Sequence, residues 1–468
     1  MKRWKKKGLS VLTGKANREK FLSKITTNLF LHPLFMKTVC LISLGCPKNL
    51  VDSEQILGLL AERGYGVVSQ PEEAEVVILN TCAFLKEAVS ESKRYLRTLL
   101  QSKRKKQKIL VTGCLVQRLG HRLKKNKGID GLVGTGDPAQ VVVALKECFS
   151  GKPVFRVSLE TFSQKTLYPR LVTTPFYAYL KISEGCSHRC RYCLIPSLRG
   201  PGRSYPLEQI LTEAQALYGQ GTKELILVAQ DTALYGRDLP GKIDLAFLLR
   251  KLAGIGFPWI RLLYLHPAHL TPEVLEIMQE YRCFCRYLDL PFQHAHPEML
   301  KKMGRPVIDG RKIVEEVRKK LPGVALRSTF LVGFPGETER HFDYLVNFLK
   351  ETRLDRVGIF GFSREKGTPA YEDRGQIPGN LIRQRKRFLL ALQREISRKK
   401  LREKVGQKLL VLVEGKSSQG WFGRTEFDAP EIDGLVRIRE GELKPGVILP
   451  VKIVASDNYD LEGRLSPP

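Results

Sequence analysis

Apolar runs alternate with amphipathic stretches over the first third of the chain, beginning at about residue 37. The three clearest apolar runs are Val39–Leu44, Val76–Asn80 and Ile109–Gly113. Each has the length and composition of a buried strand. Amphipathic sequence over residues 49–63 and 81–100 predicts two helices between them, the first ending at Gly64. Buried strands that alternate with helices predict a parallel sheet with helices on both faces, and we expect this domain over residues 37–160.

A second series of strand-and-helix units follows a polar linker over residues 158–174. Its predicted strands are residues 176–182, 225–229, 260–265, 287–290, 326–332 and 356–360. Repeated units of this kind predict a (β/α) barrel, and about six strands make it a partial one. We expect the barrel over residues 172–404, with its site at the carboxyl ends of the strands.

The pattern changes again at residue 405. Leu409–Val413 is followed by Gly and Ser turns and by several short strands with alternating apolar and polar positions. This texture predicts a small antiparallel β-barrel, of the size that binds oligonucleotides, over residues 405–468. The whole chain is therefore predicted to be an α/β protein of several domains.

Composition indicates an intracellular enzyme. The chain has 468 residues, and no apolar run approaches the roughly 20 residues needed to span a bilayer, so we expect no membrane association. Ten cysteines are too few for a disulfide scaffold in a chain of this length. Their clustering suits metal binding in a reducing cytoplasm, which is the expected location.

The net charge of +30 is extreme, and part of it lies in residues 1–36. This extension could be a basic arm that binds nucleic acid or a transit peptide. We favour a third interpretation, a mis-called start or disordered tail ahead of a natural start at Met36. Basic stretches remain at residues 103–106 and 394–408. Contact with an RNA-containing partner, such as ribosomal RNA, is therefore expected.

Three cysteines lie close together in the segment Gly185–Cys193. Cys186, Cys190 and Cys193 have a CxxxCxxC spacing, which we call the loop triplet. Three thiolates on one loop can hold three irons of a 4Fe-4S cluster and leave the fourth iron open. Electron-carrying clusters usually have four cysteines, and structural zinc sites usually pair two CxxC units. No fourth Cys or well-placed His completes a set here, since His188 lies inside the loop.

A second set of cysteines follows the strands of the first predicted sheet. Cys46, Cys82 and Cys114, the amino-terminal triplet, each come directly after one of the three apolar runs. The carboxyl ends of parallel strands converge on one crevice, so these thiols are expected to meet at a second metal site. Cys40 is mid-strand and is assigned to the core, and Cys283 and Cys285 are assigned structural roles.

These features resemble the methylthiotransferase family of radical S-adenosylmethionine (SAM) enzymes. CxxxCxxC with an aromatic residue before the last Cys is the radical SAM signature, and the order of motifs matches from Met36 to the C-terminus. The most similar branch modifies an aspartate of the small-subunit ribosomal protein S twelve. Its matching segments are residues 43–49, 181–186, 229–232, 291–295, 333–337 and 428–434. Transfer-RNA methylthiotransferases usually carry Gly-Cys-Gln-Met-Asn at the first cysteine, whereas this chain has Gly-Cys-Pro-Lys-Asn.

The resemblance implies two 4Fe-4S clusters, SAM, an electron donor and a terminal barrel of the TRAM type. It implies that a 5′-deoxyadenosyl radical abstracts hydrogen from the β-carbon of the target aspartate. It also implies that a sulfide at the second cluster is first methylated by a separate SAM. The alternatives are a tRNA adenosine methylthiotransferase and a non-catalytic iron–sulfur protein that binds RNA or senses redox state.

The resemblance and the strand-end positions together suggest a set of SAM contacts. They are Tyr192, Gln230, Asp231, Thr232, Gln293, Arg327 and Gly333. Tyr192 corresponds to the family's aromatic residue near the adenine, and Gly333 opens a Gly-Phe-Pro-Gly segment that lets backbone approach the adenine. The remaining five lie on or near ends of predicted barrel strands. The histidines at positions 266, 269, 294 and 296 are expected to be core or loop residues.

The predicted terminal barrel carries four carboxylates within eight residues. They are Glu426, Asp428, Glu431 and Asp433. An RNA-binding face would present Lys and Arg instead. We therefore hypothesise that this acidic segment, residues 426–433, docks a basic ribosomal protein. The alternative is that these side chains form turns and internal ion pairs.

Overall fold

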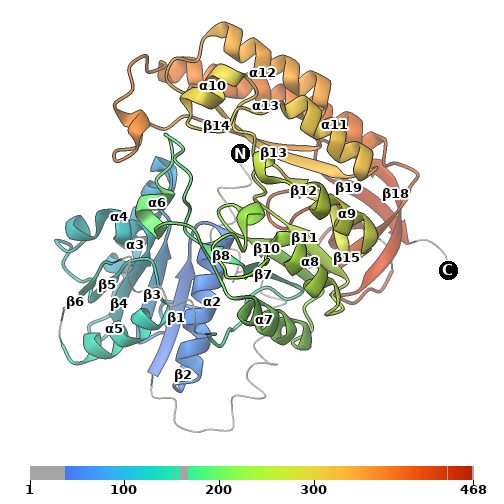
Figure 1. Cartoon of the computed structure of the whole chain (residues 1–468). Helices are drawn as coiled ribbons and strands as arrows, with labels where there is room; N and C mark the ends of the chain where they lie inside the picture. Colours follow the sequence, from blue (N-terminus) through green and yellow to red (C-terminus); the bar gives the residue numbers. More distant parts are fainter. Residues whose placement is uncertain (1–36, 152, 159–166, 440, 466–468) are drawn as a thin grey trace. The chain divides into compact units, whose positions relative to one another are not determined.

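A computed structural model of the chain describes residues 37–151, 153–158, 167–439 and 441–465 (Figure 1). The predicted basic extension, residues 1–36, lies outside these described residues. The chain divides into two compact units. The first unit contains the described residues up to 175 together with residues 184–187 and 194–209. The second unit contains residues 176–183, residues 188–193 and the described residues from 210 onward.

The first unit contains a six-stranded sheet in the order β2-β1-β3-β4-β5-β6, with all neighbouring strands parallel. Its strands are β1 (Lys37–Ser43), β2 (Tyr65–Val67), β3 (Val76–Thr81), β4 (Lys108–Gly113), β5 (Gly131–Val133) and β6 (Val154–Arg156). The three strands predicted from the sequence are β1, β3 and β4, so the predicted parallel sheet is confirmed. The other strands have three residues each, which is too short for a recognisable period.

Helices cover both faces of this sheet (Figure 1). They are α2 (Pro47–Ala61), α3 (Lys86–Gln101), α4 (Cys114–Leu123), α5 (Ala139–Phe149) and α6 (Ile195–Arg199). Alternate residues of β3 enter two separate cores. Val76 and Ile78 join the core beneath α2 and α5, whereas Val77 and Leu79 join the core beneath α3 and α4. This division explains why the whole strand is apolar. Cys40 is buried in the second core, as predicted.

The second unit contains six parallel strands in the order β14-β13-β12-β11-β10-β7, which confirms the predicted partial barrel. They are β7 (Tyr177–Lys181), β10 (Glu224–Val228), β11 (Trp259–Leu262), β12 (Phe284–Asp289), β13 (Ala325–Val332) and β14 (Arg356–Gly361). Its larger helices are α7 (Leu207–Gly219), α8 (Leu245–Ala253), α9 (Pro272–Glu280), α11 (Gly310–Lys320), α12 (Glu339–Thr352) and α13 (Gly379–Arg402). Across the described ranges, no helix is both long and apolar enough to cross a membrane.

The terminal residues of the second unit form a small closed barrel in the order β15-β16-β17-β19-β18, as predicted. Its strands are β15 (Lys408–Ser417), β16 (Gly420–Thr425), β17 (Val436–Ile438), β18 (Ile448–Ser456) and β19 (Leu461–Leu465). Four pairings are antiparallel, and the β17–β19 pairing is parallel. Val411, Val436 and Val451 are fully buried in the barrel interior.

A buried ion network joins this barrel to the parallel sheet. Glu224, the first residue of β10, is fully buried and accepts hydrogen bonds from Arg261 Nε and Arg424 Nη2, both at 2.6 Å. Arg261 lies on β11 and Arg424 lies on β16 of the terminal barrel. Each buried charge has a partner of opposite sign, which is the condition for tolerating such groups inside a protein.

The acidic segment 426–433 continues this junction. Asp428 accepts from Arg356 Nη2 at 2.6 Å, and Asp433 accepts from Arg327 Nη1 at 3.0 Å. Glu426 accepts from the backbone N–H of Arg286, and Glu431 accepts from the Tyr177 hydroxyl, both at 2.9 Å. All four carboxylates therefore have partners within the chain. Of the four, Asp428 and Asp433 pair with arginines, as the alternative of internal ion pairs expects. Docking of a ribosomal protein on this segment stays a prediction.

Candidate active site

The amino-terminal triplet lies at the carboxyl ends of three adjacent strands. Cys46 caps the start of α2 after β1, Cys82 directly follows β3, and Cys114 is the first residue of α4 after β4. The charges of Cys46 and Cys114 both raise the pKa of the Cys82 thiol. The three sulfurs are thus close enough to interact electrostatically, as their strand-end positions predicted.

Burial is the largest influence on these thiols. It raises the pKa of Cys82 to about 12 and also raises that of Cys114, while the Arg199 guanidinium acts in the opposite direction on Cys114. Thiols in this state hold their protons until a metal displaces them. Three thiols at adjacent strand ends are a donor set that fits an iron–sulfur cluster, and the guanidinium of Arg199 is a positive charge near them.

The backbone before two of these cysteines requires glycine. Gly45 has φ +104°, and a Cβ built on it would lie 2.7 Å from Cys82 Cβ and 3.1 Å from Cys82 Sγ. Gly113 has φ +92°, and its Cβ would lie 2.3 Å from Asn80 Oδ1. Both positions combine a left-handed backbone with close approach of a neighbouring loop.

We expect Gly45→Ala to disrupt the amino-terminal triplet selectively. The new methyl group would collide with Cys82 and strain the backbone beside Cys46, so iron bound at this triplet should fall while SAM cleavage persists. Iron content and 5′-deoxyadenosine release after anaerobic reconstitution measure the two effects. Gly64→Ala is a matched control, because Gly64 also has positive φ but nothing lies within 4 Å of its Cβ position. Equal iron loss in both variants would contradict the steric explanation.

Asn49 fastens the loops of this triplet and was not singled out from the sequence. Its Nδ2 donates to the carbonyls of Leu44 at 3.0 Å and Thr81 at 2.9 Å. The Asn80 side chain in turn donates to the Asn49 carbonyl at 3.0 Å. Asn49 is 1% exposed, and its place three residues after Cys46 is the signal in the sequence that could have identified it.

Backbone hydrogen bonds fix parts of the loop-triplet segment within each unit. In the first unit, Cys186 N donates to Gly200 O at 3.0 Å. In the second unit, Arg191 N donates to Met303 O, and Arg191 O accepts from Ala370 N, both at 2.9 Å. All three thiols of the loop are partly accessible. An accessible loop with three soft ligands fits a cluster that must also receive a small molecule.

Arg305 contacts this loop at Cys190 and at Tyr192, the predicted cofactor contact. Its Nη1 lies 4.0 Å from Cys190 Sγ and 3.4 Å from the Tyr192 hydroxyl, and its Nη2 donates to Pro291 O at 2.8 Å. The Tyr192 ring packs edge-on against Phe334 of the Gly-Phe-Pro-Gly segment, at 6.4 Å between centroids. The structure thus brings Tyr192 and the segment that begins at Gly333 together, as the SAM-contact prediction requires.

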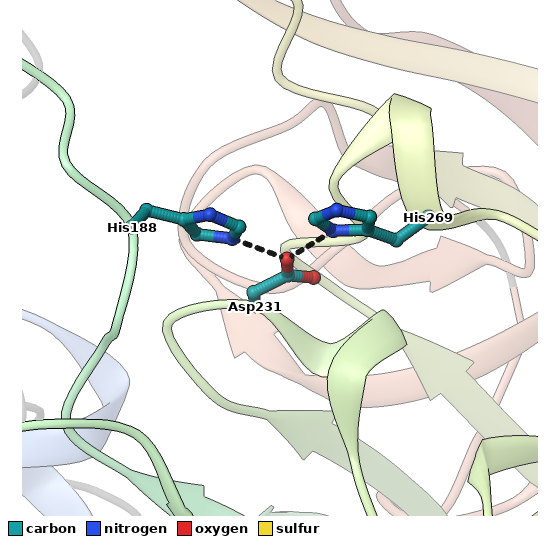
Figure 2. A group of neighbouring side chains, drawn as sticks. All are labelled: His188, Asp231 and His269. Atoms are coloured by element: carbon teal, nitrogen blue, oxygen red, sulfur yellow. Dashed lines mark hydrogen bonds and ion pairs between the residues drawn. The ribbon is translucent and has the colours of Figure 1, made fainter. Parts of the chain in front are cut away.

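Asp231 is shared between two histidines, which the sequence did not connect. His188 Nε2 and His269 Nδ1 lie 2.7 Å and 2.8 Å from the same oxygen, Asp231 Oδ2. Figure 2 shows the two imidazoles approaching this oxygen from opposite sides. The pKa of Asp231 is held well below its usual range, since the hydrogen bonds from both imidazoles outweigh its burial. Asp231 is therefore a carboxylate that fixes the orientation of both rings.

The ligand atoms of this trio lie within 4.8 Å of one another, and two imidazoles with one carboxylate can hold a divalent ion. The ring nitrogens and the carboxylate oxygen are, however, already joined by hydrogen bonds. Asp231 Oδ2 therefore orients the two imidazoles, and contact of Asp231 with SAM stays a prediction. Its location after β10, with His269 after β11, is the signal that could have connected these residues, because neighbouring strands end side by side.

Two further side chains beside this trio have polar atoms that lack protein partners. His266 stacks on His188 and His269, at 4.9 Å and 4.6 Å between centroids, and its Nδ1 accepts from Ala268 N. Burial lowers the pKa of His266 to about 3, so the ring is neutral and its Nε2 carries the proton. Within the described ranges, neither this N–H nor the buried amide of Gln230 has a hydrogen-bond partner. Each is a buried polar group without a protein partner, and a bound ligand could supply one.

The other predicted SAM contacts divide into two groups. Gln293 has φ +68°, a left-handed backbone conformation that is uncommon for a residue with a side chain. Gly333 has φ +77°, which glycine adopts readily, and a Cβ built there would lie 2.3 Å from Ile382 Cγ1. Thr232 is fully buried and donates to Leu263 O at 2.5 Å, and Arg327 pairs with Asp433 at the terminal barrel. These last two side chains have partners within the protein, and their contact with SAM stays a prediction.

His294 and His296 are structural, as expected. His294 is fully buried and its Nδ1 accepts from His296 N at 3.0 Å. His296 caps α10 (Pro297–Lys302) by accepting from Glu298 N. Burial, followed by the charges of His296, His341 and Arg385, lowers the pKa of His294 to about 3. The folded protein therefore keeps this ring neutral.

The neutral His294 should make the protein less stable in mild acid. Below the unfolded pKa of about 6.5 the unfolded chain binds a proton that the folded ring refuses. Stability should therefore fall from about pH 6.5 toward pH 3, by up to about 1.4 kcal/mol per pH unit for this group. Urea unfolding between pH 7.5 and pH 5 should show a smaller pH dependence for His294→Phe than for wild type. His121→Phe, at an exposed position on α4, is the control, and an unchanged slope for His294→Phe would contradict the assignment.

Comparisons with known proteins place this site in a class. Residues 38–134 match the Uncharacterized protein family UPF0004, residues 180–349 match the Radical SAM superfamily, and residues 405–465 match the TRAM domain. The fold is similar to that of the radical S-adenosylmethionine methyltransferase TsrM from Kitasatospora setae. The TM-score is 0.56 at 15% identity, covering 77% of this chain and 89% of TsrM. The chain is thus a radical SAM enzyme, a class whose cofactors are an iron–sulfur cluster and SAM.

Relatives define the family within this class. The chain is 45% identical over 438 residues to the ribosomal protein uS12 methylthiotransferase RimO of Pelotomaculum thermopropionicum, covering 91% of this chain and 98% of the relative. It is also 45% identical to RimO of Caldanaerobacter subterraneus subsp. tengcongensis, covering 92% and 100%. The chain belongs to the RimO family of radical SAM methylthiotransferases.

Proposed function

We propose that this protein transfers a methylthio group to the β-carbon of an aspartate in ribosomal protein uS12, the S twelve protein of the small subunit. The observation that carries the proposal is the convergence of Cys46, Cys82 and Cys114 in a chain that also has the CxxxCxxC loop. One cysteine triplet suffices for SAM cleavage. A second triplet supplies a separate place where sulfur can be held.

Two 4Fe-4S clusters are proposed, one at the amino-terminal triplet and one at the loop triplet. When bound, the clusters and SAM supply the electron, the radical and the sulfur needed to convert a C–H bond into a C–S bond. An unactivated C–H bond is beyond acid–base chemistry, which is why a cofactor carries this reaction. The protein binds and orients the groups and excludes water.

The residues proposed to contact SAM are Tyr192, Gln230, Asp231, Gln293 and Gly333. Gln230 offers a buried amide with both polar atoms unused among the described residues. Asp231 holds His188 and His269 in fixed orientations beside it. Tyr192 packs against Phe334 next to Gly333. These side chains follow the carboxyl ends of barrel strands, where sites of (β/α) proteins are built.

The proposal extends to organisation and partners. We propose an amino-terminal domain over residues 37–160, a radical SAM domain over residues 172–404 and a TRAM-like barrel over residues 405–468. We also propose an electron donor as partner and a cytoplasmic location. Ribosomal RNA contact is supported by exposed cations of α13, among them Arg383, Arg387 and Lys399. Charged surfaces of this sign bind phosphate backbones.

A strain that lacks the gene tests the substrate. Mass spectrometry of its ribosomal peptides should show loss of one methylthio group from a uS12 aspartate, restored by the wild-type gene and not by a Cys82→Ala variant. Nucleosides from digested tRNA should be unchanged. Loss of a methylthio group from a tRNA adenosine, with uS12 unaffected, would overturn the proposal in favour of the tRNA enzyme.

A further inference from the structure

A buried arginine lies beside the amino-terminal triplet. Arg199, the last residue of α6, is 4% exposed. Its Nη1 donates to Glu184 Oε1 at 2.9 Å, and its Nη2 donates to Asp52 Oδ2 at 3.0 Å and to the side-chain oxygen of Asn49. Asn49 is the residue that fastens the triplet loops. The guanidinium is therefore part of the same buried polar network as the cysteines.

Arg199 is connected to the thiols through Asn49. The Asn49 Oδ1 that accepts from Arg199 Nη2 also lies 3.9 Å from Cys46 Sγ. Burial raises the pKa of the Cys114 thiol, and the guanidinium charge acts in the opposite direction. Conversely, the charges of Cys114 and Cys46 help to raise the pKa of Arg199, after those of Glu184 and Asp52. The guanidinium is thus a fixed positive charge at the sulfurs, and it keeps that charge at any physiological pH.

The position of Arg199 is built into the first unit. Leu194, at the N-cap of α6, and Leu198, within the helix, are buried in the core beneath α3 and α4. The Thr135 hydroxyl donates to the Leu198 carbonyl. Gly200, which follows Arg199, accepts from Cys186 N at 3.0 Å. These contacts hold the arginine without help from the thiols, so removing its charge should leave the backbone in place.

We propose that Arg199 is a positioning residue that raises the reduction potential of the cluster held by Cys46, Cys82 and Cys114. The inference rests on the proposed function, because it requires a cluster at this triplet. Hydrogen bonds to ligand sulfur and nearby positive charge stabilise the reduced form, which carries one more negative charge. Glu184 and Asp52 have the opposite effect, and Arg199 offsets them.

Arg199 and Asp52 carry opposite charges beside the amino-terminal triplet. Removing each charge should therefore shift the midpoint potential of the cluster in opposite directions. In full-length protein with Cys186, Cys190 and Cys193 replaced by alanine, the remaining cluster can be titrated alone by EPR-monitored reduction. Arg199→Gln should lower the midpoint potential, and Arg199→Lys should lower it less. Asp52→Asn should raise it, because a negative charge is removed. A purely structural role for the network does not predict shifts of opposite sign.

Arg170→Gln is the matched control. Arg170 pairs with Glu54 at 2.5 Å in the same unit and is equally buried, with side chains 4% and 1% exposed. Neither residue is among the charges that shift the pKa of Cys82 or Cys114. Arg170→Gln should lower the stability of the protein and leave the midpoint potential of the cluster unchanged.

Unchanged potentials in both Arg199→Gln and Asp52→Asn would overturn the inference. If Arg199→Gln fails to hold a cluster, Asp52→Asn decides alone: a raised potential supports the inference and an unchanged one overturns it. Absence of any cluster in the parent protein with the intact amino-terminal triplet would overturn the two-cluster proposal instead.

Discussion

Replacing Cys186, Cys190 and Cys193 by alanine should reduce the iron content from about eight to about four per chain and abolish SAM cleavage. The cluster proposed at the loop triplet would have three cysteine ligands and one open iron, where SAM would bind to receive an electron. Removing the loop triplet should leave Cys46, Cys82 and Cys114 able to bind iron, because these residues are held by β1, β3 and β4. Iron analysis and 5′-deoxyadenosine release measure the result.

The reciprocal variant separates the two functions. Alanine at Cys46, Cys82 and Cys114 should also leave about four irons, with SAM cleavage retained and methylthio transfer lost. Cys148→Ala is the control, since this cysteine lies on α5, is buried in the core beneath α2 and α5, and belongs to neither triplet. Finding only about four irons in the intact anaerobic protein would contradict the two-cluster assignment.

Glu224→Gln should lower the free energy of unfolding by about 3–5 kcal/mol, which is the usual effect of breaking a buried ion network. The substitution leaves the guanidinium groups of Arg261 and Arg424 buried without the carboxylate that both contact at 2.6 Å. Because this network joins β10, β11 and β16, the terminal barrel should also become more susceptible to proteolysis. Urea unfolding and limited proteolysis measure these effects.

An exposed ion pair provides the comparison. Arg398 and Glu395 lie 2.6 Å apart on α13, with side chains 39% and 52% exposed. Glu395→Gln should change stability by less than about 1 kcal/mol, because solvent screens such pairs. Similar losses in Glu224→Gln and Glu395→Gln would show that the junction beneath the barrel contributes little.

The apolar runs predicted the fold well because buried parallel strands leave a strong mark on a sequence. β1, β3, β4 and the six strands of the partial barrel were all identified in this way. The same reasoning placed Cys46, Cys82 and Cys114 together, since the ends of adjacent parallel strands must meet. Three-residue strands such as β5 carry too few positions to show a period.

Pairs of polar side chains were much harder to predict. Asp231, His188 and His269 come from three separate segments, and nothing local indicates that they share one carboxylate oxygen. Arg199 and Glu224 look like surface charges in the sequence, yet their partners are Glu184, Arg261 and other distant residues. The acidic segment 426–433 shows the same difficulty, because Asp428 and Asp433 pair with arginines on strands far earlier in the chain.

Methylthio transfer to the β-carbon of a uS12 aspartate can be tested with purified, fully loaded enzyme and uS12 that carries deuterium at the aspartate β-carbons. We predict that uS12 gains one methylthio group and that deuterium appears in 5′-deoxyadenosine. The Cys46, Cys82 and Cys114 alanine variant should cleave SAM without modifying uS12. Unmodified uS12 together with methylthio-adenosine formed in added tRNA, by the same enzyme preparation, would contradict the account.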